Sequence, residues 1–515
     1  MTRCSFCKRL ITDPKHIQLG MGPVCLKKHS EMNKPDTLEN SNPEKEAESF
    51  LTEILNKSKF KGKVYSVGGF VRDDLLGIKS KDLDIVVESP DGAKELSNFI
   101  HEKYTDQTSA AYQIGAGYPI WHIAFKKDIE INGKIFKTAG AEIDIADTQK
   151  ESFPDPETRQ RITQYGSIDD DCRRRDFRVN MILRDLTTGK IVDKVNGIDD
   201  LRNGILRGHP DVDLDKTFSD DPLRMIRLMR FESKFGWKVP LSVLKKVKKN
   251  AERINIVSQE RIRDELIKVM NMGKLSRSVR FMKATGLLKH VLPEIQAMDK
   301  VAQDRIYHSE GDVFKHSCLV LEKANPTIVA QMSALLHDVG KPGTQSIEGD
   351  RIKFYGHEAL STEMTEVIMK RLKFENSDII KVKKIVLNHL RAHFSKDWSD
   401  KAVRKFIRDS GDELEDILHL NEIDGESSLG PDMKPVKVGI VENLRARIKE
   451  QNKFPIKKVS ILNGQEVMLA LGLKPGKDVG EALNKLKDIE DDYAITGKEI
   501  SKEQATEELL KFFKR

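Results

Sequence analysis

The sequence predicts an α+β fold, in which a head that contains the strands precedes a long helical remainder. Between residues 46 and 185, the runs KVYSV, DLDIVV and AEIDIA are rich in β-branched residues and alternate with helical patterns. From residue 186 onwards, apolar residues recur at helical spacing, for example in DPLRMIRLMRFESKF and SQERIRDELIKVM. The length of 515 residues indicates several domains rather than one core.

Composition narrows the class of protein without fixing it. The formal net charge of +7 fits a polyanionic partner but does not require one. No stretch approaches the roughly 20 apolar residues of a membrane helix, and the first residues, MTRCSFCKRL, lack the apolar stretch of a signal peptide. We therefore expect a cytoplasmic protein without a membrane partner, whose 5 cysteines stay reduced.

The first element, residues 1–30, is a small unit rich in Cys and His. Two residues separate its first pair of cysteines, and a third cysteine precedes a histidine by four positions, a spacing typical of zinc ligands. The run LGMGPVC resembles the second knuckle of small zinc ribbons. These features favour bound Zn²⁺ over free thiols. The expected zinc ligands are Cys4, Cys7, Cys25 and His29, with His16 as the alternative to His29.

A polar linker at 31–45 leads to the head, expected at 46–185, whose segment VYSVGGFVRDDLLGIKSKDLDIVVE is the most informative part of the chain. Gly68 and Gly69 follow a strand and precede a helical turn. Glycines at such a turn let backbone N–H groups approach phosphate oxygens closely. Arg72 lies just beyond them, and we expect it to contact a triphosphate.

Carboxylates are the second feature of this segment. Asp82 and Asp84 lie two residues apart on an expected strand, which places both side chains on one face. Two carboxylates at one spot need a cation, and Mg²⁺ suits a site that combines carboxylates with substrate phosphates. Asp144, in AEIDIADT, is either a third metal carboxylate or a support for the first two. The expected catalytic acids are Asp82, Asp84 and Asp144.

The segment GGFVRDDLLGIKSKDLDIVV resembles the first motif of class II tRNA nucleotidyltransferases and bacterial poly(A) polymerases, within the polymerase β superfamily. CRRRDFRVN, DKVNGIDDL and DDPLRMIRLMRF resemble the second, third and fourth motifs, in the family's order. The match runs from about 60 to 300 and recurs in an HD domain and the tail. It implies a polymerase β-type nucleotidyltransferase head with a small mixed sheet, followed by all-helical neck, HD and tail domains. It also implies two Mg²⁺ ions that act on an attacking 3′-hydroxyl and a leaving pyrophosphate.

The resemblance also assigns residues. In the family, the second motif handles the ribose and phosphates of the nucleotide, and the residues that match it are Arg174, Arg175, Asp176 and Asn180. The third motif is a hinge-like element, with Asp193 and Gly197. Gln149 stands where related enzymes often have Arg, and Asp220 where they often have Glu. These departures leave open which nucleotides are added and in what order.

The neck, expected at 186–300, contains the fourth motif. Asp221 precedes Pro222, which predicts a helix capped by Asp221, and Arg224 is its neighbour across one helical turn. Such a pair can read the Watson–Crick edge of a base, and in the family it selects CTP and ATP over GTP and UTP. Arg227, one turn further, completes the expected nucleotide-binding set. Four nearby lysines are either RNA contacts or a solvated face: Lys245, Lys246, Lys248 and Lys249.

The HD block, defined as residues 301–435, is where the histidines concentrate. The order of a His, an adjacent His–Asp pair and a distant Asp resembles the HD phosphohydrolase superfamily, and such ligands suit a divalent metal. A metal-activated water would attack a 2′,3′-cyclic phosphate or a phosphorylated RNA end, unless the domain is degenerate. The expected ligands are His316, His337, Asp338 and Asp424. His357, and His389 with His393 one turn further, are candidates to hold a second metal or to bind phosphate.

The tail, expected at 436–515, resembles the helical C-terminal element that follows HD domains in this family, and we expect it to bind RNA. Gly476 and Gly480 frame a helix start that Lys474 and Lys477 flank, where an RNA phosphate would fit. A solvated face explains the same residues equally well.

Together these features predict a template-independent RNA 3′-end nucleotidyltransferase. It would add CCA, or part of it, to tRNA from CTP and ATP, and would also have a metal-dependent HD phosphohydrolase activity. The alternative in the same class is a poly(A) polymerase or A-adding enzyme that uses ATP only. Other classes are an RNA-binding protein with a decayed polymerase site and a repair hydrolase. The intact Asp82, Asp84, Arg175 and Asp221 favour the polymerase.

Overall fold

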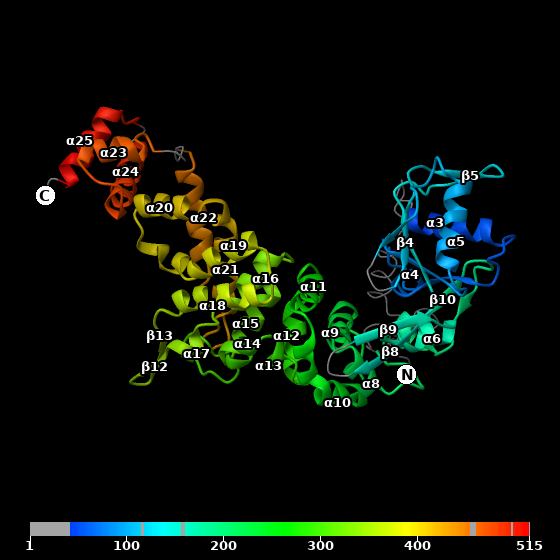
Figure 1. Cartoon of the computed structure of the whole chain (residues 1–515). Helices are drawn as coiled ribbons and strands as arrows, with labels where there is room; N and C mark the ends of the chain where they lie inside the picture. Colours follow the sequence, from blue (N-terminus) through cyan, green and yellow to red (C-terminus); the bar gives the residue numbers. More distant parts are fainter. Residues whose placement is uncertain (1–41, 115–117, 156–159, 454–459, 496–497, 514–515) are drawn as a thin grey trace, which may run out of the picture. The chain divides into compact units, whose positions relative to one another are not determined.

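The computed structural model describes residues 42–114, 118–155, 160–453, 460–495 and 498–513, which form two compact units (Figure 1). The first unit ends at Asp220 and includes Lys238–Pro240, and the second consists of Asp221–Trp237 and the chain from Leu241 onwards. No described helix is both long and apolar enough to cross a membrane. The residues expected to bind zinc lie outside the described residues: Cys4, Cys7, Cys25, His29 and the alternative His16.

A seven-stranded sheet forms the centre of the first unit, which we call the head. Its order is β11-β10-β1-β2-β7-β4-β3. β2 and β7 run parallel and the other neighbours run antiparallel, so the mixed sheet is confirmed. Its strands are β1 (Val64–Val67), β2 (Leu83–Val87), β3 (Tyr112–Ile114), β4 (Ile120–Ala124), β7 (Glu142–Asp147), β10 (Leu183–Asp185) and β11 (Ile191–Val192).

Helices and two separate hairpins complete the head. The first helix that the structure describes begins at Pro43, because the Asn42 side chain accepts a hydrogen bond from the Glu44 N–H and proline suits the first helical position. The last residues of the expected linker, 31–45, therefore lie in this helix. These elements are α3 (Pro43–Leu55), α4 (Gly69–Leu75), α5 (Gly92–Lys103), α6 (Ile168–Arg173), η1 (Arg178–Asn180), α7 (Gly197–Asn203), α8 (Leu214–Asp220), and the hairpins β5 (Ile129–Ile131) with β6 (Lys134–Phe136) and β8 (Gln149–Asp155) with β9 (Gln160–Tyr165).

The head extends further along the chain than expected. β11 pairs with β10 and the first compact unit continues to Asp220, beyond the expected head end at residue 185. β11 has only 2 residues, too few to show the alternation of a strand in the sequence. Asp193 follows it and accepts hydrogen bonds from the backbone N–H groups of Gly197 and Ile198, both at 2.9 Å. These bonds fix the turn into α7.

The neck begins the second unit and is helical, as expected. Its first helix starts at Leu223 with Pro222 in the N-cap position, so the expected cap at Asp221 is one residue too early. The backbone of Pro222 is already helical, with φ −62 and ψ −20, which moves the start of the helix along the chain. The neck elements are α9 (Leu223–Phe235), α10 (Leu241–Asn250), η2 (Ala251–Ile256), α11 (Gln259–Met270), α12 (Leu275–Thr285), α13 (Leu288–Val291) and α14 (Pro293–Ala297).

The HD block is helical apart from one hairpin, which the sequence analysis missed. The hairpin turns at Gly349, whose φ of 59 suits glycine, and pairs β12 with β13. The adjacent His337 and Asp338 lie directly after the end of α16. The elements are α15 (Val313–Lys323), α16 (Ile328–Leu336), α17 (Lys341–Thr344), β12 (Gln345–Glu348), β13 (Arg351–Phe354), α18 (His357–Arg371), α19 (Asn376–Leu387), η3 (Arg391–Asp397), α20 (Asp400–Ser410), η4 (Gly411–Glu413) and α21 (Leu414–Ser427).

The tail contains four more helices, and the first of them packs with the HD block. α22 (Ile440–Gln451) contacts η3 and α20 and buries Val441, Leu444 and Ile448. The others share a core of their own that includes Val467 and Leu486. They are α23 (Gly464–Leu471), α24 (Lys477–Ile495) and α25 (Lys502–Phe513). α24 starts between Gly476 and Gly480, where the sequence predicted a helix start.

Candidate active sites

The carboxylates of the head meet in the middle of its sheet. β2 and β7 are parallel neighbours, and their register pairs Asp84 with Asp144. Asp84 is the one exposed position of an otherwise buried strand, and both acids line a cavity of about 410 Å³. Asp82 is exposed and lies just before the strand, next in the chain to Leu83. The structure therefore brings Asp84 and Asp144 together at one cavity and places Asp82 at its margin.

The Asp84 carboxyl lies in negative surroundings although water reaches it. Desolvation by the surrounding protein raises its pKa to about 6, and repulsion from Asp144 and Asp82 adds to this, while Arg175 opposes it. Crowded carboxylates favour a cation between them, because the cation offsets their mutual repulsion. Oxygen ligands of this kind fit a hard divalent cation.

Gly68 lies between the Asp84 carboxylate and the Arg175 guanidinium group. It joins β1 to α4 with φ 71 and ψ −130, a backbone region essentially restricted to glycine. A Cβ placed there would lie 3.2 Å from Arg175 Nη1 and 3.9 Å from Asp84 Oδ2. The absence of a side chain at Gly68 therefore lets a positive and a negative group approach the same turn.

Asp171 holds both arginines of the second motif, although the sequence analysis did not single it out. Its Oδ1 accepts a hydrogen bond from Arg174 Nε at 2.8 Å, and its Oδ2 accepts one from Arg175 Nε at 2.9 Å. Burial alone would raise the pKa of Asp171, but Arg175 and Arg174 outweigh burial and keep that pKa below its usual value. Asp171 thus orients Arg174 and Arg175, which both line the cavity.

Arg72, Asp176 and Asn180 form a buried network. Arg72 is only 5% exposed; its Nη1 donates to Asn180 Oδ1 at 2.6 Å and its Nε to Asp73 Oδ1 at 2.7 Å. Asn180 in turn donates to Asp176 Oδ1 at 2.8 Å. Arg72 also lies beneath the glycine turn, because its Nη2 is 3.6 Å from a Cβ placed at Gly69. This geometry makes Arg72 a support for the turn, and its expected contact with a triphosphate stays a prediction.

His122 is a further polar residue at the carboxylates. It is the register partner of Asp144 across β4 and β7, and its Nδ1 lies 2.8 Å from Asp144 Oδ1. An imidazole at this distance fixes the orientation of the carboxylate. Only the register of the sheet reveals this pair.

The fourth-motif residues lie at α9 in the second unit, and α11 contacts them. Asp221 Oδ2 is 3.7 Å from Arg261 Nη2. Arg227 Nη1 is 3.9 Å from Glu265 Oε1. The side chains of Asp221, Arg224 and Arg227 are partly exposed. Their role in selecting a base stays a prediction.

In the HD block, the first expected ligand set converges from three separate elements. His316 comes from α15, His337 follows α16, and Asp424 comes from α21, and they place one ligand atom each within 4.8 Å of one another. His316 Nε2 lies 2.9 Å from Asp424 Oδ1, although 108 residues separate the two in the sequence.

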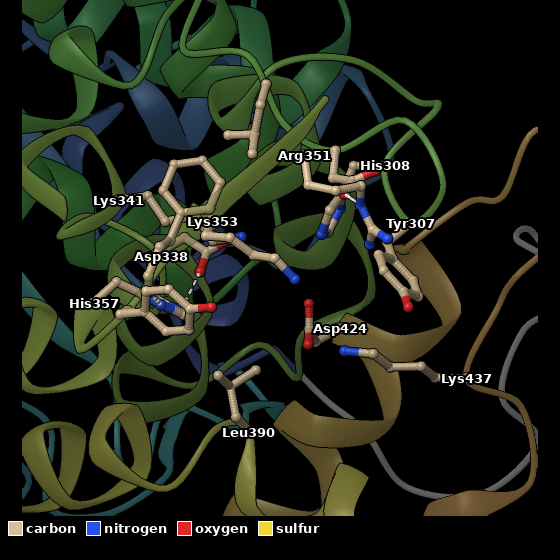
Figure 2. A pocket seen from close by; sticks show the side chains of 14 residues that line it. Tyr307, His308, Asp338, Lys341, Arg351, Lys353, His357, Leu390, Asp424 and Lys437 are labelled. Atoms are coloured by element: carbon tan, nitrogen blue, oxygen red, sulfur yellow. Dashed lines mark hydrogen bonds and ion pairs between the residues drawn. The ribbon is translucent and has the colours of Figure 1, made fainter. Parts of the chain in front are cut away.

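Asp338 connects this set to a second one. Its Oδ2 lies 3.2 Å from His337 Nε2. Its Oδ1 lies 3.4 Å from His357 Nε2 and 3.7 Å from His389 Nε2. Figure 2 shows Asp338, His357 and Asp424 around one pocket. A single carboxylate therefore faces both groups of histidines.

The orientation of the imidazole rings supports metal binding here. The Nδ1 atoms of His337, His357 and His389 face the backbone carbonyl oxygens of Ala334, Phe354 and Val386 at 2.7–2.9 Å. Carbonyl oxygens only accept hydrogen bonds, so each Nδ1 must be the protonated nitrogen. Each Nε2 then presents a lone pair to the centre, the tautomer that a metal ligand requires.

Two further observations agree with a cation at the centre. His337 Nε2 is buried and has no hydrogen-bond partner among the described residues. His316 is fully buried, which by itself lowers its pKa, but Asp424 and Glu310 outweigh burial and raise that pKa to about 9. Glu310, not foreseen from the sequence, accepts a hydrogen bond from His316 Nδ1 at 2.8 Å. These residues fit a divalent metal ion.

Comparison with known proteins gives a consistent order of domains. Residues 64–207 match the poly A polymerase head domain, 238–299 match the probable RNA and SrmB-binding site of polymerase A, and 306–431 match the HD domain.

The chain is also similar to whole proteins. It is 30% identical over 438 residues to an A-adding tRNA nucleotidyltransferase of Deinococcus radiodurans, covering 82% of this chain and 89% of that protein. It is 25% identical to a CC-adding tRNA nucleotidyltransferase of Thermus thermophilus, covering 84% and 91%. Among solved structures, the Bacillus stearothermophilus CCA-adding enzyme in complex with CTP has the same fold, with a TM-score of 0.59, 19% identity, and coverage of 92% of this chain and 98% of that chain.

Proposed function

The chain belongs to the family of tRNA nucleotidyltransferases and poly(A) polymerases, and we propose that it adds CCA, or part of that sequence, to tRNA 3′ ends from CTP and ATP. The observation that supports this most directly is the pairing of Asp84 with Asp144 beside Gly68 and Arg175. Activities that add only CC or only A, as the names of its relatives state, fall within the proposal.

In the head, we assign the binding of Mg²⁺ to Asp82, Asp84 and Asp144. Such ions, when bound, activate a hydroxyl nucleophile and offset charge on the leaving pyrophosphate. The backbone N–H groups of Gly68 and Gly69 would hold the triphosphate. The 3′-oxygen of the RNA forms a bond to the α-phosphorus while the bond to the pyrophosphate oxygen breaks, and the hydroxyl proton is lost to solvent.

The arginines of the second motif would hold the nucleotide beside these acids. Arg175 and Arg174 line the cavity, and Asp171 fixes their side chains, so their charges are positioned before a nucleotide binds. Asp176 and Asn180 would act through the buried network with Arg72. In the neck, we assign base selection to Asp221 and Arg224, with Arg227 beside them.

The HD block would be a metal-dependent phosphohydrolase that acts on phosphorylated RNA ends or cyclic phosphates. Nucleotidyltransferases of this family and HD domains use divalent metals, and the identity of each ion belongs to the proposal. A bound ion would supply an activated water. The water oxygen bonds to phosphorus, the ester oxygen leaves, and the water's proton ends on that leaving oxygen. The ligands would be His316, His337, Asp338 and Asp424, with His357 and His389 for a second ion.

We propose two further properties from the sequence and from the similarity to tRNA nucleotidyltransferases. Zn²⁺ would bind in the N-terminal module, and the protein would work in the cytoplasm, where its RNA and nucleotide substrates are. The proposed zinc ligands are Cys4, Cys7, Cys25 and His29.

A nucleotide-addition assay tests the main proposal. The protein is incubated with three tRNA transcripts, ending before CCA, after C and after CC, and with each labelled nucleoside triphosphate alone. Addition of C, of A or of both, stopping at the end of CCA, is the expected result. Long tails made from ATP alone would instead favour the poly(A) polymerase alternative, and no addition to any transcript would contradict both.

Replacing Gly68 with alanine is expected to slow nucleotide addition by about 100-fold, because a Cβ at this turn would strain the backbone and push the Arg175 guanidinium, 3.2 Å away, out of its position. Gly133→Ala is the matched control. Gly133 also has a positive φ, of 80, but no atom lies within 4 Å of its Cβ position, so it tests backbone strain without the contact. Initial rates of addition to tRNA measure the effect, and equal rates in the two variants would contradict the assignment.

A further inference from the structure

The pocket of the HD block contains more positive charge than its own acids neutralise. Its volume is about 270 Å³, and its lining includes Lys341, Arg351, Lys353 and Lys437. Lys341 Nζ lies 2.7 Å from Asp338 Oδ2 and donates to Gln303 at 2.8 Å. Arg351 pairs with Asp304. Two of these cations are therefore accounted for within the protein.

The other two cations, Lys353 and Lys437, have no ion pair or side-chain hydrogen bond among the residues that the structure describes. Lys353 comes from β13, and Lys437 from the segment between α21 and α22. Figure 2 shows both ammonium groups directed toward Asp424 from different directions. Asp424 already contacts His316 and His393, at 2.9 and 3.0 Å. Lys437 acts electrostatically on Asp424 and Lys353 on Asp304, but neither ammonium group lies within ion-pair distance of an acid among the described residues. Both groups can therefore bind an anion that comes from outside.

Aromatic side chains lie on the same lining. Tyr355, which follows β13, is 67% exposed, and Tyr307 is 44% exposed. The Arg351 guanidinium lies 5.6 Å from the centre of the Tyr307 ring. Exposed aromatic rings next to basic groups are typical of surfaces that bind single-stranded nucleic acid, because every base can stack on them.

The size of the pocket helps to decide whether its substrate is a single nucleotide or an RNA strand. A volume of about 270 Å³ lies just below the roughly 300–1,000 Å³ found for ligand pockets, so it holds little more than one nucleotide. A mononucleotide would leave the exposed rings and one of the two lysines unused. An RNA strand would enter with its terminal phosphate and lay its next residues over the rim.

We propose that Lys353, Lys437 and Tyr355 form a subsite for single-stranded RNA, which holds the residue and phosphate next to the terminal phosphate ester at Asp338. This proposal rests on the proposed phosphohydrolase activity of the HD block. It predicts that this activity prefers an RNA strand to a free nucleotide. The β12–β13 hairpin, the one departure from an all-helical HD block among the described residues, supplies Lys353 and leads directly into Tyr355.

Hydrolysis by the full-length protein tests this subsite. The two substrates are a ten-nucleotide RNA that ends in a 2′,3′-cyclic phosphate and the mononucleotide 2′,3′-cyclic AMP, each with Mg²⁺, Mn²⁺, Co²⁺ or Ni²⁺. Wild-type kcat/KM is expected to be at least about tenfold higher for the RNA. The K353A/K437A double variant should lower kcat/KM on the RNA about tenfold, and the slope of log kcat/KM against log salt should weaken by about 0.7 for each phosphate that no longer meets a lysine.

Two variants of Tyr355 test whether its ring stacks on an RNA base, and a third variant controls for the loss of a positive charge. Tyr355→Ala should lower kcat/KM on the RNA by about tenfold, whereas Tyr355→Phe, which keeps the ring, should retain most of it. Lys381→Ala, at an exposed position of α19, is the matched control for removal of a positive charge and should match the wild type.

The outcomes distinguish failure of the RNA subsite from failure of the phosphohydrolase activity itself. Equal wild-type kcat/KM on both substrates, or variants that lower both equally, would overturn the RNA subsite and leave the phosphohydrolase in place. Hydrolysis of neither substrate with any of the metals would overturn the phosphohydrolase and the subsite together.

Discussion

Replacing Asp84 with asparagine is expected to lower nucleotide addition at least about 1,000-fold, equivalent to about 4 kcal/mol of transition-state stabilisation. Asp84 pairs with Asp144 in the cavity of the head, and an amide cannot replace a carboxylate as a ligand of Mg²⁺ at full strength. Hydrolysis at the HD site should stay within twofold of wild type. Single-turnover addition of one nucleotide to tRNA, followed by gel electrophoresis, measures the effect.

The stability of this variant provides its own control. Because the pKa of Asp84 is raised to about 6, the folded head disfavours the ionised carboxylate at pH 7. A neutral amide should therefore leave the Tm unchanged or raise it, so a fall in activity would not reflect unfolding. Glu130→Gln, at an exposed position of β5, is the matched control for removal of a negative charge. Addition within tenfold of wild type in the Asp84 variant would place the chemistry elsewhere.

Replacing Asp338 with asparagine is expected to lower phosphate-ester hydrolysis at least about 1,000-fold and to leave nucleotide addition within twofold. Its two oxygens face two different sets of histidines, so one change weakens both sets. Hydrolysis of p-nitrophenyl phosphate and of 2′,3′-cyclic AMP measures the loss. The metal content of the dialysed protein should also fall.

The choice of asparagine preserves the shape of a buried position. Asp338 is 1% exposed and pairs with the buried Lys341, so a smaller side chain would leave a buried ammonium group with Gln303 as its one remaining side-chain partner among the described residues and with a gap beside it. Asp412→Asn, at an exposed position of η4, is the matched control. Loss of both activities with an unchanged Tm would show that the two sites are not separate.

Local patterns in the sequence were enough to identify the candidate site residues, but not the residues that each of them contacts in the fold. The period of two in DLDIVV predicted that Asp82 and Asp84 share one face of a strand; Asp84 is the exposed position of β2, whereas Asp82 lies just before the strand begins. Asp144 could be recognised as an acid on another strand, but the register that pairs it with Asp84 depends on how the whole sheet assembles. The same limit applies to His122.

Arg72 shows why a motif does not fix the position of a side chain. Its place after two glycines suggested a phosphate contact. The structure leaves that contact a prediction, but it shows a hydrogen bond from Arg72 to Asn180, which lies 108 residues further along the chain and is connected to it by no local pattern. Burial between α4 and η1 is a tertiary effect that sequence spacing does not contain.

Two missed features did have a signal in the sequence. Asp171 lies three and four residues before Arg174 and Arg175, a spacing that places an acid beside both bases on a helix. The segment SIEGDRIKF has a two-residue Gly–Asp turn between short runs that contain isoleucine, which is typical of a hairpin. The helical patterns on either side obscured it.

The parallel pairing of β2 with β7 has a consequence for how the head folds. The chain between these two strands contains α5 and the strands β3 to β6, so their contact joins residues far apart in the sequence. Such contacts form slowly, because the connecting chain loses entropy before the contact stabilises it. A slip of β7 by one residue would also turn Asp144 to the opposite face. A newly synthesised chain is therefore inert as a polymerase until the sheet has closed in its correct register.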